Sequence, residues 1–374
     1  MKKQKIANII LLCLLAAIMA FFSFSYIFVE EKTFSENENR VLQTLPRFTL
    51  EKLLNGVYTR QLHDYFSDQI NLRSEMIELK ANAELLMGKN ENNGILLGRD
   101  GYLIETHNYT DDNYDFLKKN LYKIEKLMKT LNGAGISTNS VIIPRKVDIL
   151  QNYFSPYYSD ERNQYAWSLV SETHFTLNFA LSQAQKYGTK VFYKTDHHWT
   201  AEGAYHAYLE IGNILGYSPN SLNSFDLQTL SNDFLGTTYS KSGFFFADSE
   251  EIKAPSFEIG QYKVTIVDTG VEFDTLYDET YLEKKDKYST FLSGNNAHVK
   301  IYDMESNNKE TLLIIKDSFS HSLAPYLCEH YNIELIDPRY FSGSIEDYIK
   351  ENNINNVLFI FGIDTLASAN LIIR

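Results

Sequence analysis

Four short runs of apolar, mostly β-branched residues constrain the fold more than any other feature of this sequence. They are Ser140–Ile143, Thr311–Ile315, Ile333–Ile336 and Val357–Phe361. Runs of this length without polar alternation are typical of strands buried on both faces. Residues 116–131, before the first run, and residues 204–215, between the first two, carry apolar residues at helical spacing. Strands that alternate with helices predict a parallel α/β sheet covered by helices on both faces.

Other parts of the chain show different sequence patterns. From about residue 218 to 307, short aromatic and β-branched pieces are separated by Gly, Ser, Asn and Asp, which we interpret as a β-rich insertion. Residues 50–87 show two amphipathic helical patterns, and residues 95–104 show two apolar runs about a glycine-containing turn, as in a hairpin. We interpret Lys190–Tyr193 as the strand that leads into the sequence Asp196-His197-His198-Trp199.

The amino-terminal part predicts a membrane helix. Ile6–Phe28 is an uncharged run of 23 residues, and about 20 are needed to span a bilayer. Three lysines precede it and two glutamates follow it, which orients the amino terminus in the cytoplasm. A cleaved signal peptide is the alternative, but its apolar run would be shorter and Ser25–Phe28 is a poor cleavage site. We therefore expect a single-pass protein of the cell membrane whose main domain is extracytoplasmic.

We expect three parts: a cytoplasmic tail and transmembrane anchor in residues 1–30, a stalk with amphipathic helices in 31–90, and the α/β domain in 91–374. The 374 residues carry a formal charge of −13, and because three lysines lie in the tail the rest carries −16. Such an acidic balance argues against a nucleic-acid partner. Cys328 is alone in the extracytoplasmic part, so no intramolecular disulfide is expected there.

Two segments carry the groups needed for nucleophilic catalysis. Ser318 follows one apolar run and precedes a helical pattern, while Asp196 and His198 follow another. Since ligands collect beyond the carboxyl ends of parallel strands, we expect all three on one rim. There His198 would take the proton of Ser318, and Asp196 would orient the imidazole. Free N–H groups at the start of the helix would stabilise an oxyanion.

Each of these residues also has a structural interpretation. Ser318 could be only a helix cap, and His197 and Trp199 could line a pocket without binding substrate. Asp196 with its two histidines could hold a metal, but no compact second cluster completes the ligand set. The other histidines considered are scattered along the chain: His174, His206, His298, His321 and His330. We expect no metal and no cofactor.

Asp196-His197-His198-Trp199 resembles the motif that names the bacterial DHHW family, and the wider pattern is similar to the alginate O-acetyltransferase family of SGNH-hydrolase-like proteins. The supporting segments, in chain order, are Phe34–Arg40, Gly98–Leu103, Pro144–Lys146, the DHHW box, Phe291–Asn295 and Lys316–Phe319. The resemblance implies an SGNH-hydrolase-like fold in which Ser318 is the nucleophile, His198 the base and Asp196 its partner. The order of Asp and His before Ser resembles the permuted arrangement of the alginate enzymes.

The resemblance also implies partners. The acetyl group would pass through an acyl-enzyme to a polysaccharide hydroxyl, and a multi-pass membrane O-acyltransferase would bring it across the bilayer. Lys-Asp-Ser stands where esterases usually have Gly-Asp-Ser, and no Gly-x-Asn-Asp block follows. Asn295 is therefore a candidate oxyanion donor, with a turn residue as the alternative. Arg339 would orient an acyl or anionic sugar group, or would form a salt bridge.

Three functions remain open at this stage. The first is an O-acetyltransferase acting on a cell-surface or exported polysaccharide. The second is a carbohydrate acetylesterase that uses the same three residues with water as acceptor. The third is a non-catalytic glycan-binding or scaffold protein, which predicts that Ser318→Ala leaves function intact.

Overall fold

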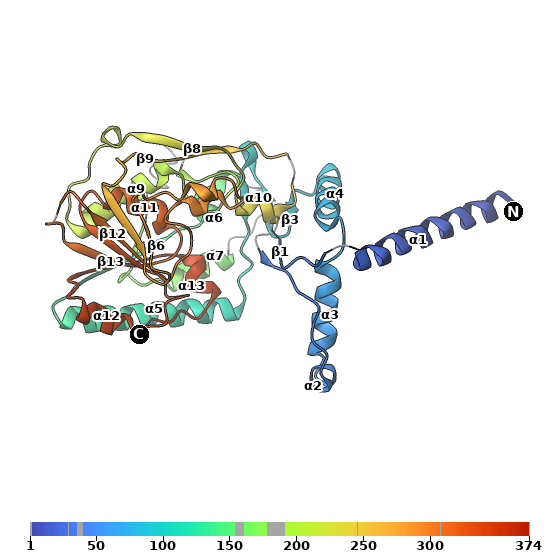
Figure 1. Cartoon of the computed structure of the whole chain (residues 1–374), viewed down its shortest axis with the longest axis horizontal. Coiled ribbons are helices and arrows are strands. Elements are labelled where there is room, and N and C mark those ends of the chain that lie inside the picture. Colours follow the sequence, from blue (N-terminus) through green and yellow to red (C-terminus); the bar gives the residue numbers. More distant parts are fainter. Residues whose placement is uncertain are drawn as a thin grey trace. The chain divides into compact units, whose positions relative to one another are not determined.

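The computed structural model describes residues 2–28, 30–35, 40–153, 161–177, 191–244, 246–306 and 308–373. The chain divides into two compact units (Figure 1). Met1–Lys89 and Gly243–Phe245 form the first, which we call the N-terminal unit. Asn90–Ser242 and Phe246–Arg374 form the second, which we call the α/β unit. Residues 36–39, part of the first motif segment in the sequence, lie outside the described residues.

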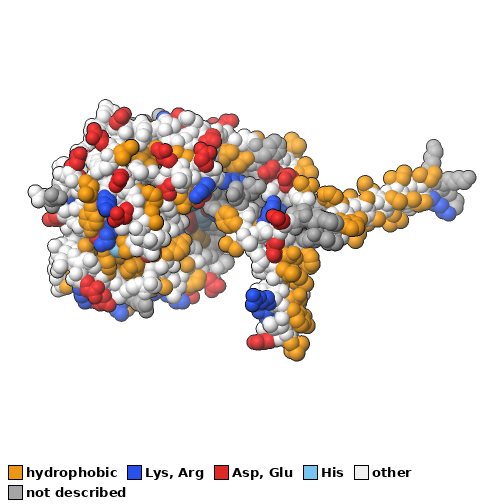
Figure 2. All heavy atoms as spheres, in the orientation of Figure 1, with side chains coloured by type: hydrophobic (Ala, Val, Ile, Leu, Met, Phe, Trp, Pro, Cys, Tyr) orange, Lys and Arg blue, Asp and Glu red, His pale blue; other side chains and the backbone are white. Residues whose placement is uncertain are grey.

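The N-terminal unit begins with one long apolar helix. Among the described residues, α1 (Lys2–Phe28) is the one helix long and apolar enough to cross a membrane. Figure 2 shows hydrophobic side chains along its length, and none of the residues from Gln4 to Phe21 is buried. A signal sequence near the N-terminus meets the same criterion, so the helix is compatible with either role. The unit continues with β1 (Phe34–Ser35), β2 (Arg40–Val41), α2 (Leu50–Leu54), α3 (Val57–Asp68) and α4 (Arg73–Leu86).

An eight-stranded sheet forms the centre of the α/β unit, in the order β11-β10-β12-β14-β13-β15-β6-β7. The five strands from β14 to β7 run parallel, and the other three extend the sheet antiparallel. The strands are β6 (Ser137–Ile143), β7 (Phe175–Thr176), β10 (Tyr262–Ile266), β11 (Val271–Phe273), β12 (His298–Asp303), β13 (Thr311–Lys316), β14 (Asn332–Ile336) and β15 (Asn356–Gly362). The four apolar runs of the sequence are thus the central parallel strands. Three strands of the expected β-rich insertion, β10, β11 and β12, extend this sheet by pairing next to β14.

Helices cover both faces of the sheet, as the sequence predicts. Because successive side chains of a strand point to opposite faces, Leu312 and Ile314 pack in the cluster with α9 and α11, whereas Leu313 and Ile315 pack with α5, α12 and α13. Figure 1 shows the same two layers. The helices are α5 (Asp111–Gly133), α9 (Ala201–Leu215), α11 (Ser320–Leu327), α12 (Ile345–Glu351) and α13 (Ile363–Ser368).

Smaller elements surround this centre. The hairpin expected at residues 95–104 is confirmed, since β4 pairs antiparallel with β5. The strands outside the large sheet are β3 (Glu91–Asn92), β4 (Ile95–Leu97), β5 (Leu103–Glu105), β8 (Leu227–Phe234) and β9 (Glu250–Pro255). The short α-helices are α6 (Lys146–Ile149), α7 (Glu161–Ser168) and α10 (Thr237–Ser242). The 3₁₀ helices are η1 (Arg99–Gly101), η2 (Gln151–Tyr153), η4 (Leu222–Ser224), η5 (Glu279–Tyr281) and η6 (Lys287–Thr290).

The strand expected at Lys190–Tyr193 is a wrong prediction. Lys190 lies outside the described residues, and the three residues after it form no strand of the sheet. Instead Phe192 makes a single antiparallel bridge with Trp199, and the N–H of Tyr193 donates to the carbonyl of His198 at 3.2 Å. The apolar side chains here are buried in the cluster beside α9. A short apolar run that packs as a loop has the same pattern as a short buried strand.

The loop is attached to the start of α9. Thr200 caps this helix, since its side chain accepts a hydrogen bond from the N–H of Gly203 at 3.2 Å. Gly203 also permits the loop to lie against the helix, because a Cβ there would be 2.1 Å from the carbonyl oxygen of Val191. The residues just before Thr200 are therefore held at a fixed end of a helix.

Glu334 is a buried carboxylate in β14 that joins strand and helix side chains. Its oxygens accept hydrogen bonds from the hydroxyl groups of Tyr302, at 2.5 Å, and Tyr348. Burial alone would raise the pKa of this carboxyl, but interactions with His298, Tyr302 and Tyr348 lower it to about 2. A further contribution comes from Lys300, whose Nζ is 3.2 Å away. The ionised form is therefore the one that the fold stabilises.

Glu334→Gln is expected to lower the free energy of unfolding at pH 7 by roughly 1–3 kcal/mol, as for a buried group that loses charge-assisted hydrogen bonds. Because the folded-state pKa is below the unfolded value of about 4.3, this contribution is complete above that pH and is lost as the pH falls toward the folded pKa. Trp167 and Trp199 both lie in the α/β unit, so denaturant titration followed by tryptophan fluorescence reports on it. A difference between variant and parent that does not shrink on acidification would contradict the prediction.

Candidate active site

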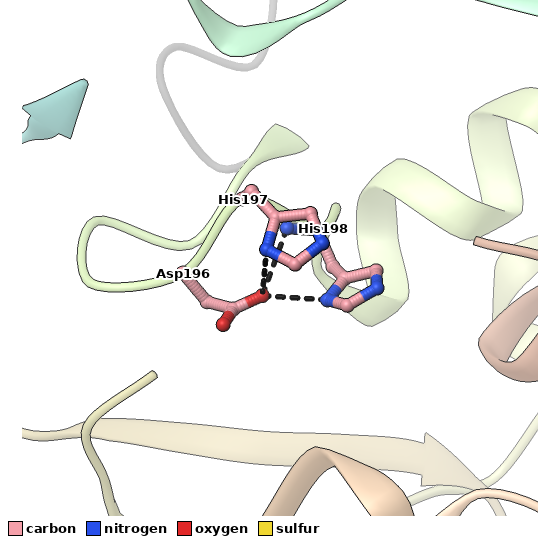
Figure 3. Close-up of side chains that lie close together, drawn as sticks. All are labelled: Asp196, His197 and His198. Atoms are coloured by element: carbon pink, nitrogen blue, oxygen red, sulfur yellow. Dashed lines mark hydrogen bonds and ion pairs between the residues drawn. The ribbon is translucent and has the colours of Figure 1, made fainter. Parts of the chain in front are cut away.

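Three side chains from two distant segments form a hydrogen-bonded line. Nε2 of His198 is 2.8 Å from Oγ of Ser318, and Nδ1 of the same ring is 2.6 Å from Oδ1 of Asp196. The backbone N–H of His198 also donates to Oδ1, at 2.9 Å (Figure 3). The structure thus brings together the three residues that the sequence predicted, although two of them come from a loop and not from a strand end.

The loop that carries Asp196 is held by charged side chains from outside it. Glu250 in β9 accepts hydrogen bonds from the N–H groups of Lys194 and Thr195, both at 2.8 Å, and from the hydroxyl of Thr195 at 2.6 Å. The Nζ of Lys146 donates to the carbonyls of Leu103, at 3.0 Å, and Lys194, at 3.2 Å. A buried loop needs partners for its backbone polar groups, and these two side chains supply them.

Asp196 is buried and fully hydrogen-bonded. Its Oδ2 accepts from the N–H of Thr237 at 2.7 Å and from the hydroxyl of the same residue at 2.9 Å. Burial would raise the pKa of this carboxyl, but the neighbouring His197 and His198 and the hydrogen bonds it accepts lower it well below the ordinary value. Asp196 is therefore an anion that can fix the imidazole of His198 and stabilise its protonated form.

Aromatic rings hold the imidazole of His198 in place. The ring of Tyr288 stacks on it with a centroid distance of 3.8 Å and an angle of 9°, and the ring of His197 lies 3.9 Å away at 37°. The hydroxyl of Tyr288 is 2.9 Å from Oγ of Ser322, and Nε1 of Trp199 donates to the same oxygen at 2.8 Å. Ser322 lies in α11, the helix that follows Ser318, so the ring of His198 and the side chain of Ser318 share one support.

Ser318 lies in the turn between β13 and α11. Asp317 fixes this turn, because its carboxylate accepts from the N–H groups of Phe319, at 3.1 Å, and Gly362, at 2.7 Å, and from the hydroxyl of Thr365 at 2.7 Å. The backbone N–H of Ser318 donates to no group within the described ranges of the chain. That N–H is a donor for a negative charge that develops beside Oγ.

The lysine of the Lys-Asp-Ser sequence belongs to a buried charge network. Nζ of Lys316 is 2.7 Å from Nε2 of His321 and 3.3 Å from Oδ2 of Asp337. Burial lowers the pKa of Lys316, and burial together with Lys316 lowers that of His321 far enough to keep the imidazole neutral. Arg339 donates to both oxygens of Asp337, at 2.9 and 2.6 Å. Arg339 therefore forms a salt bridge with Asp337.

A cavity of about 380 Å³ opens beside Ser318. Ser318, His197 and Arg339 line it, together with Arg145 and Lys146 of the Pro-Arg-Lys segment. Arg339 contributes to this wall as well as to its salt bridge, since 27% of its side chain is exposed. Two of the four substrate-binding candidates of the sequence, His197 and Arg339, are thus beside Ser318.

The other two candidates lie elsewhere. Trp199 is fully buried and packs with an edge against Phe319, at 5.1 Å between centroids. Asn295 is exposed and follows Leu292–Gly294, three residues with positive φ whose carbonyls accept from the side chain of Asn296. Neither residue lines the cavity. Asn295 is a turn residue here, the alternative that the sequence left open.

Sequence reasoning missed several residues that build this site. Thr237, Tyr288 and Glu250 contact the catalytic candidates or their loop, but they lie 40 to 90 residues away in the chain, in the part interpreted only as β-rich. The sequence Gly236-Thr237-Thr238 is a signal for a helix start. Nothing in the sequence pattern says that this helix start faces Asp196.

Three donors in the site could in principle hold a cation. Among the described residues, ligand atoms of Asp196, His197 and His198 lie within 4.8 Å of one another. Both carboxylate oxygens of Asp196 already accept hydrogen bonds, and both ring nitrogens of His198 have protein partners. The donor set is therefore used by hydrogen bonds within the chain.

Gly236 is required for the close approach of Asp196 to α10. A Cβ at this position would lie 2.3 Å from Cβ and 2.4 Å from Oδ2 of Asp196. Gly236→Ala is therefore expected to lower the free energy of unfolding by about 1–3 kcal/mol, the usual cost of overpacking. Gly133→Ala is the control, because a Cβ at this last residue of α5 meets nothing within 4 Å, and it is expected to be neutral or stabilising by up to about 1 kcal/mol. Equal stability of the two variants by tryptophan fluorescence would contradict this account.

Comparisons with known proteins give two kinds of similarity. The chain is 25% identical over 168 residues to the probable alginate O-acetylase AlgJ of Pseudomonas fluorescens, which is 41% of each chain. It is 24% identical over 173 residues to the protein of the same name from Pseudomonas syringae pv. tomato, 43% of each chain. The match thus spans less than half the length of these curated relatives.

Two solved structures share the fold. A DHHW family protein from Eubacterium siraeum has a TM-score of 0.60 and 21% identity, over 75% of this chain and 94% of that one. Bacillus cereus PatB1, in a structure with a sulfonyl adduct, has a TM-score of 0.60 and 20% identity, over 74% of this chain and 96% of that one. The family model described as DHHW protein matches residues 124–336, more than half of the chain, including the Asp196–Trp199 motif and Ser318. This chain belongs to the DHHW family.

Proposed function

We propose that this chain is an O-acetyltransferase that transfers an acetyl group to a hydroxyl of a cell-surface or exported polysaccharide. The observation that carries the proposal is the hydrogen-bonded line of Ser318, His198 and Asp196 at the edge of a cavity. The name of the Pseudomonas relatives, alginate O-acetylase, supports both the acetyl group and the polysaccharide. We further propose that the α/β unit has an SGNH-hydrolase-like fold.

The first half of the proposed reaction forms an acyl-enzyme. His198 takes the proton of Ser318 while Oγ attacks the carbonyl carbon of the acetyl donor. The N–H of Ser318 hydrogen-bonds the oxyanion of the tetrahedral intermediate. The intermediate collapses to acetyl-Ser318, and the leaving oxygen of the donor receives the proton from His198. Asp196 stabilises the imidazolium in between.

The second half regenerates the enzyme. The acceptor hydroxyl gives its proton to His198 and attacks the acetyl carbon. The bond to Oγ then breaks, and Oγ of Ser318 regains the proton from His198. Because the same base serves both halves, the identity of the acceptor decides the reaction: a sugar hydroxyl gives transfer, and water gives the acetylesterase reaction. Arg339 and His197, which line the cavity, are proposed to contact substrate, and we assign no such contact to Asn295 or Trp199.

We also propose a three-part organisation: residues 1–30 as tail and uncleaved anchor, 31–90 as stalk and helices, and 91–374 as the extracytoplasmic catalytic domain. A multi-pass membrane O-acyltransferase would supply the acetyl group, because acetyl-CoA is cytoplasmic. For the chain isolated from membranes, we expect an intact mass that shows residues 2–28 to be present. In a separate experiment, we expect crosslinking in membranes to capture a multi-pass protein together with this chain. A chain that lacks these residues would indicate a signal peptide. Repeated isolation without such a partner would remove the donor proposal.

Ser318→Ala is expected to lower the release of acetate from an activated acetyl ester by about 10³-fold or more, as for loss of a nucleophile. Ser320→Ala is the matched control. Ser320 is buried two residues further on, and its Oγ has no hydrogen-bond partner among the described residues, so this variant is expected to retain activity within about threefold. His198→Ala is expected to behave like Ser318→Ala.

The acceptor decides between the enzymatic alternatives. Mass spectrometry of an added oligosaccharide is expected to show acetyl groups gained only with an intact Ser318. Acetate release without acetyl transfer to any acceptor would favour the esterase. Activity of the folded parent no higher than that of Ser318→Ala would favour the glycan-binding or scaffold function.

A further inference from the structure

His197 lies beside the triad, and its neighbours decide which ring nitrogen carries the proton. Its Nδ1 is 2.8 Å from Oγ1 of Thr237 and 3.6 Å from Oδ1 of Asp196. A threonine hydroxyl has one proton to donate, and Thr237 donates it to Oδ2 of Asp196 at 2.9 Å. Oγ1 of Thr237 must therefore accept a hydrogen bond from His197. It follows that Nδ1 of His197 is the protonated nitrogen.

The other nitrogen, Nε2, is then a hydrogen-bond acceptor. Burial and the adjacent His198 lower the pKa of His197, against the opposing effect of Asp196, so the ring is neutral near pH 7. Figure 3 shows one ring nitrogen of His197 turned toward Asp196 and the other on the far side of the ring. Within the described part of the chain, Nε2 makes no hydrogen bond. The side chain is 38% exposed and lines the cavity that contains Ser318.

The two adjacent imidazoles thus differ in their hydrogen bonding. Both nitrogens of His198 are engaged, one with Asp196 and one with Ser318, whereas His197 offers a lone pair to the cavity. The ring centroids are only 3.9 Å apart, a separation on the scale of two adjacent hydroxyl groups of one sugar ring. An acceptor sugar could therefore give its reacting hydroxyl to His198 while a neighbouring hydroxyl reaches His197.

We propose that His197 recognises the acceptor: its Nε2 accepts a hydrogen bond from a sugar hydroxyl adjacent to the one that receives the acetyl group. This inference rests on the proposed transferase function and names the contact that would favour glycan over water. Water has no second hydroxyl to offer. A site built to hydrogen-bond a substrate hydroxyl discriminates strongly against a molecule that lacks it.

The test measures how acetyl-Ser318 divides between oligosaccharide and water. The full-length chain in detergent is incubated with an activated acetyl ester and soluble oligosaccharides of alginate, cellulose or chitin. The measured quantity is the ratio of acetyl transferred to the oligosaccharide to acetate released into water. Both products leave the same acyl-enzyme, so this ratio does not depend on the rate of acylation or on the amount of folded protein. A purely structural role of His197 would not move it.

Two variants separate the two ring nitrogens. His197→Asn places an amide donor near the position of Nδ1, toward Thr237, but has no acceptor at the position of Nε2. His197→Gln places a carbonyl oxygen near that second position. We expect the ratio to fall roughly tenfold to hundredfold in His197→Asn and to recover to within about fivefold of the parent in His197→Gln.

An acceptor without the adjacent hydroxyl completes the test. With such a deoxy sugar the parent is expected to show the low ratio already, and His197→Asn is expected to lower it no further, since the two changes remove one interaction. An unchanged ratio in His197→Asn, or equal loss of both products, overturns the inference while leaving the transferase intact. Failure of the parent to acetylate any oligosaccharide, despite Ser318-dependent acetate release, instead overturns the transferase proposal itself.

Discussion

The site depends on one buried anion. Asp196 has no access to water, and a buried carboxylate is costly unless every lone pair finds a donor. Here its two oxygens accept four hydrogen bonds, two from His198 and two from Thr237. Satisfying this charge fixes the loop backbone, the ring of His198 and the start of α10 together. The same requirement directs the hydroxyl proton of Thr237 and, through it, the proton of His197.

The position of Ser318 depends on a second set of buried charges. Asp317 ties the turn of Ser318 to the end of β15 and to α13. Directly before it, the ammonium group of Lys316 is balanced by Asp337. The charge of Asp337 is shared with Arg339, which also reaches the cavity. Removing one member of such a buried network leaves the others uncompensated, which costs more than the pair contributes when complete. The wall of the cavity and the support of Ser318 are therefore coupled.

The strand-like patterns of the sequence predict several strands correctly and one wrongly. Thr311–Ile315 and Val357–Phe361 were recognised because strands buried on both faces are apolar at every position. Val191–Tyr193 has the same local composition but packs as a loop against α9, since a tightly turned segment that bridges Phe192 to Trp199 buries its side chains equally well. The antiparallel strands β10, β11 and β12 were recognised as β-rich. Their membership of the large sheet depends on pairing with β14, which is not encoded near them in sequence.

The sequence by itself determined the chemistry available to this protein: a serine at a strand-to-helix turn, an aspartate and a histidine two residues apart, and an apolar amino-terminal segment. These are local patterns, readable because backbone geometry and burial act on neighbouring residues. Only the tertiary structure decided which residues surround that chemistry. Thr237, Glu250 and Tyr288 reach it across 40 to 90 residues of chain, and Asn295 is not among the residues that line the cavity. Such contacts arise from the packing of separate elements, which satisfies buried polar groups wherever a partner is near in space.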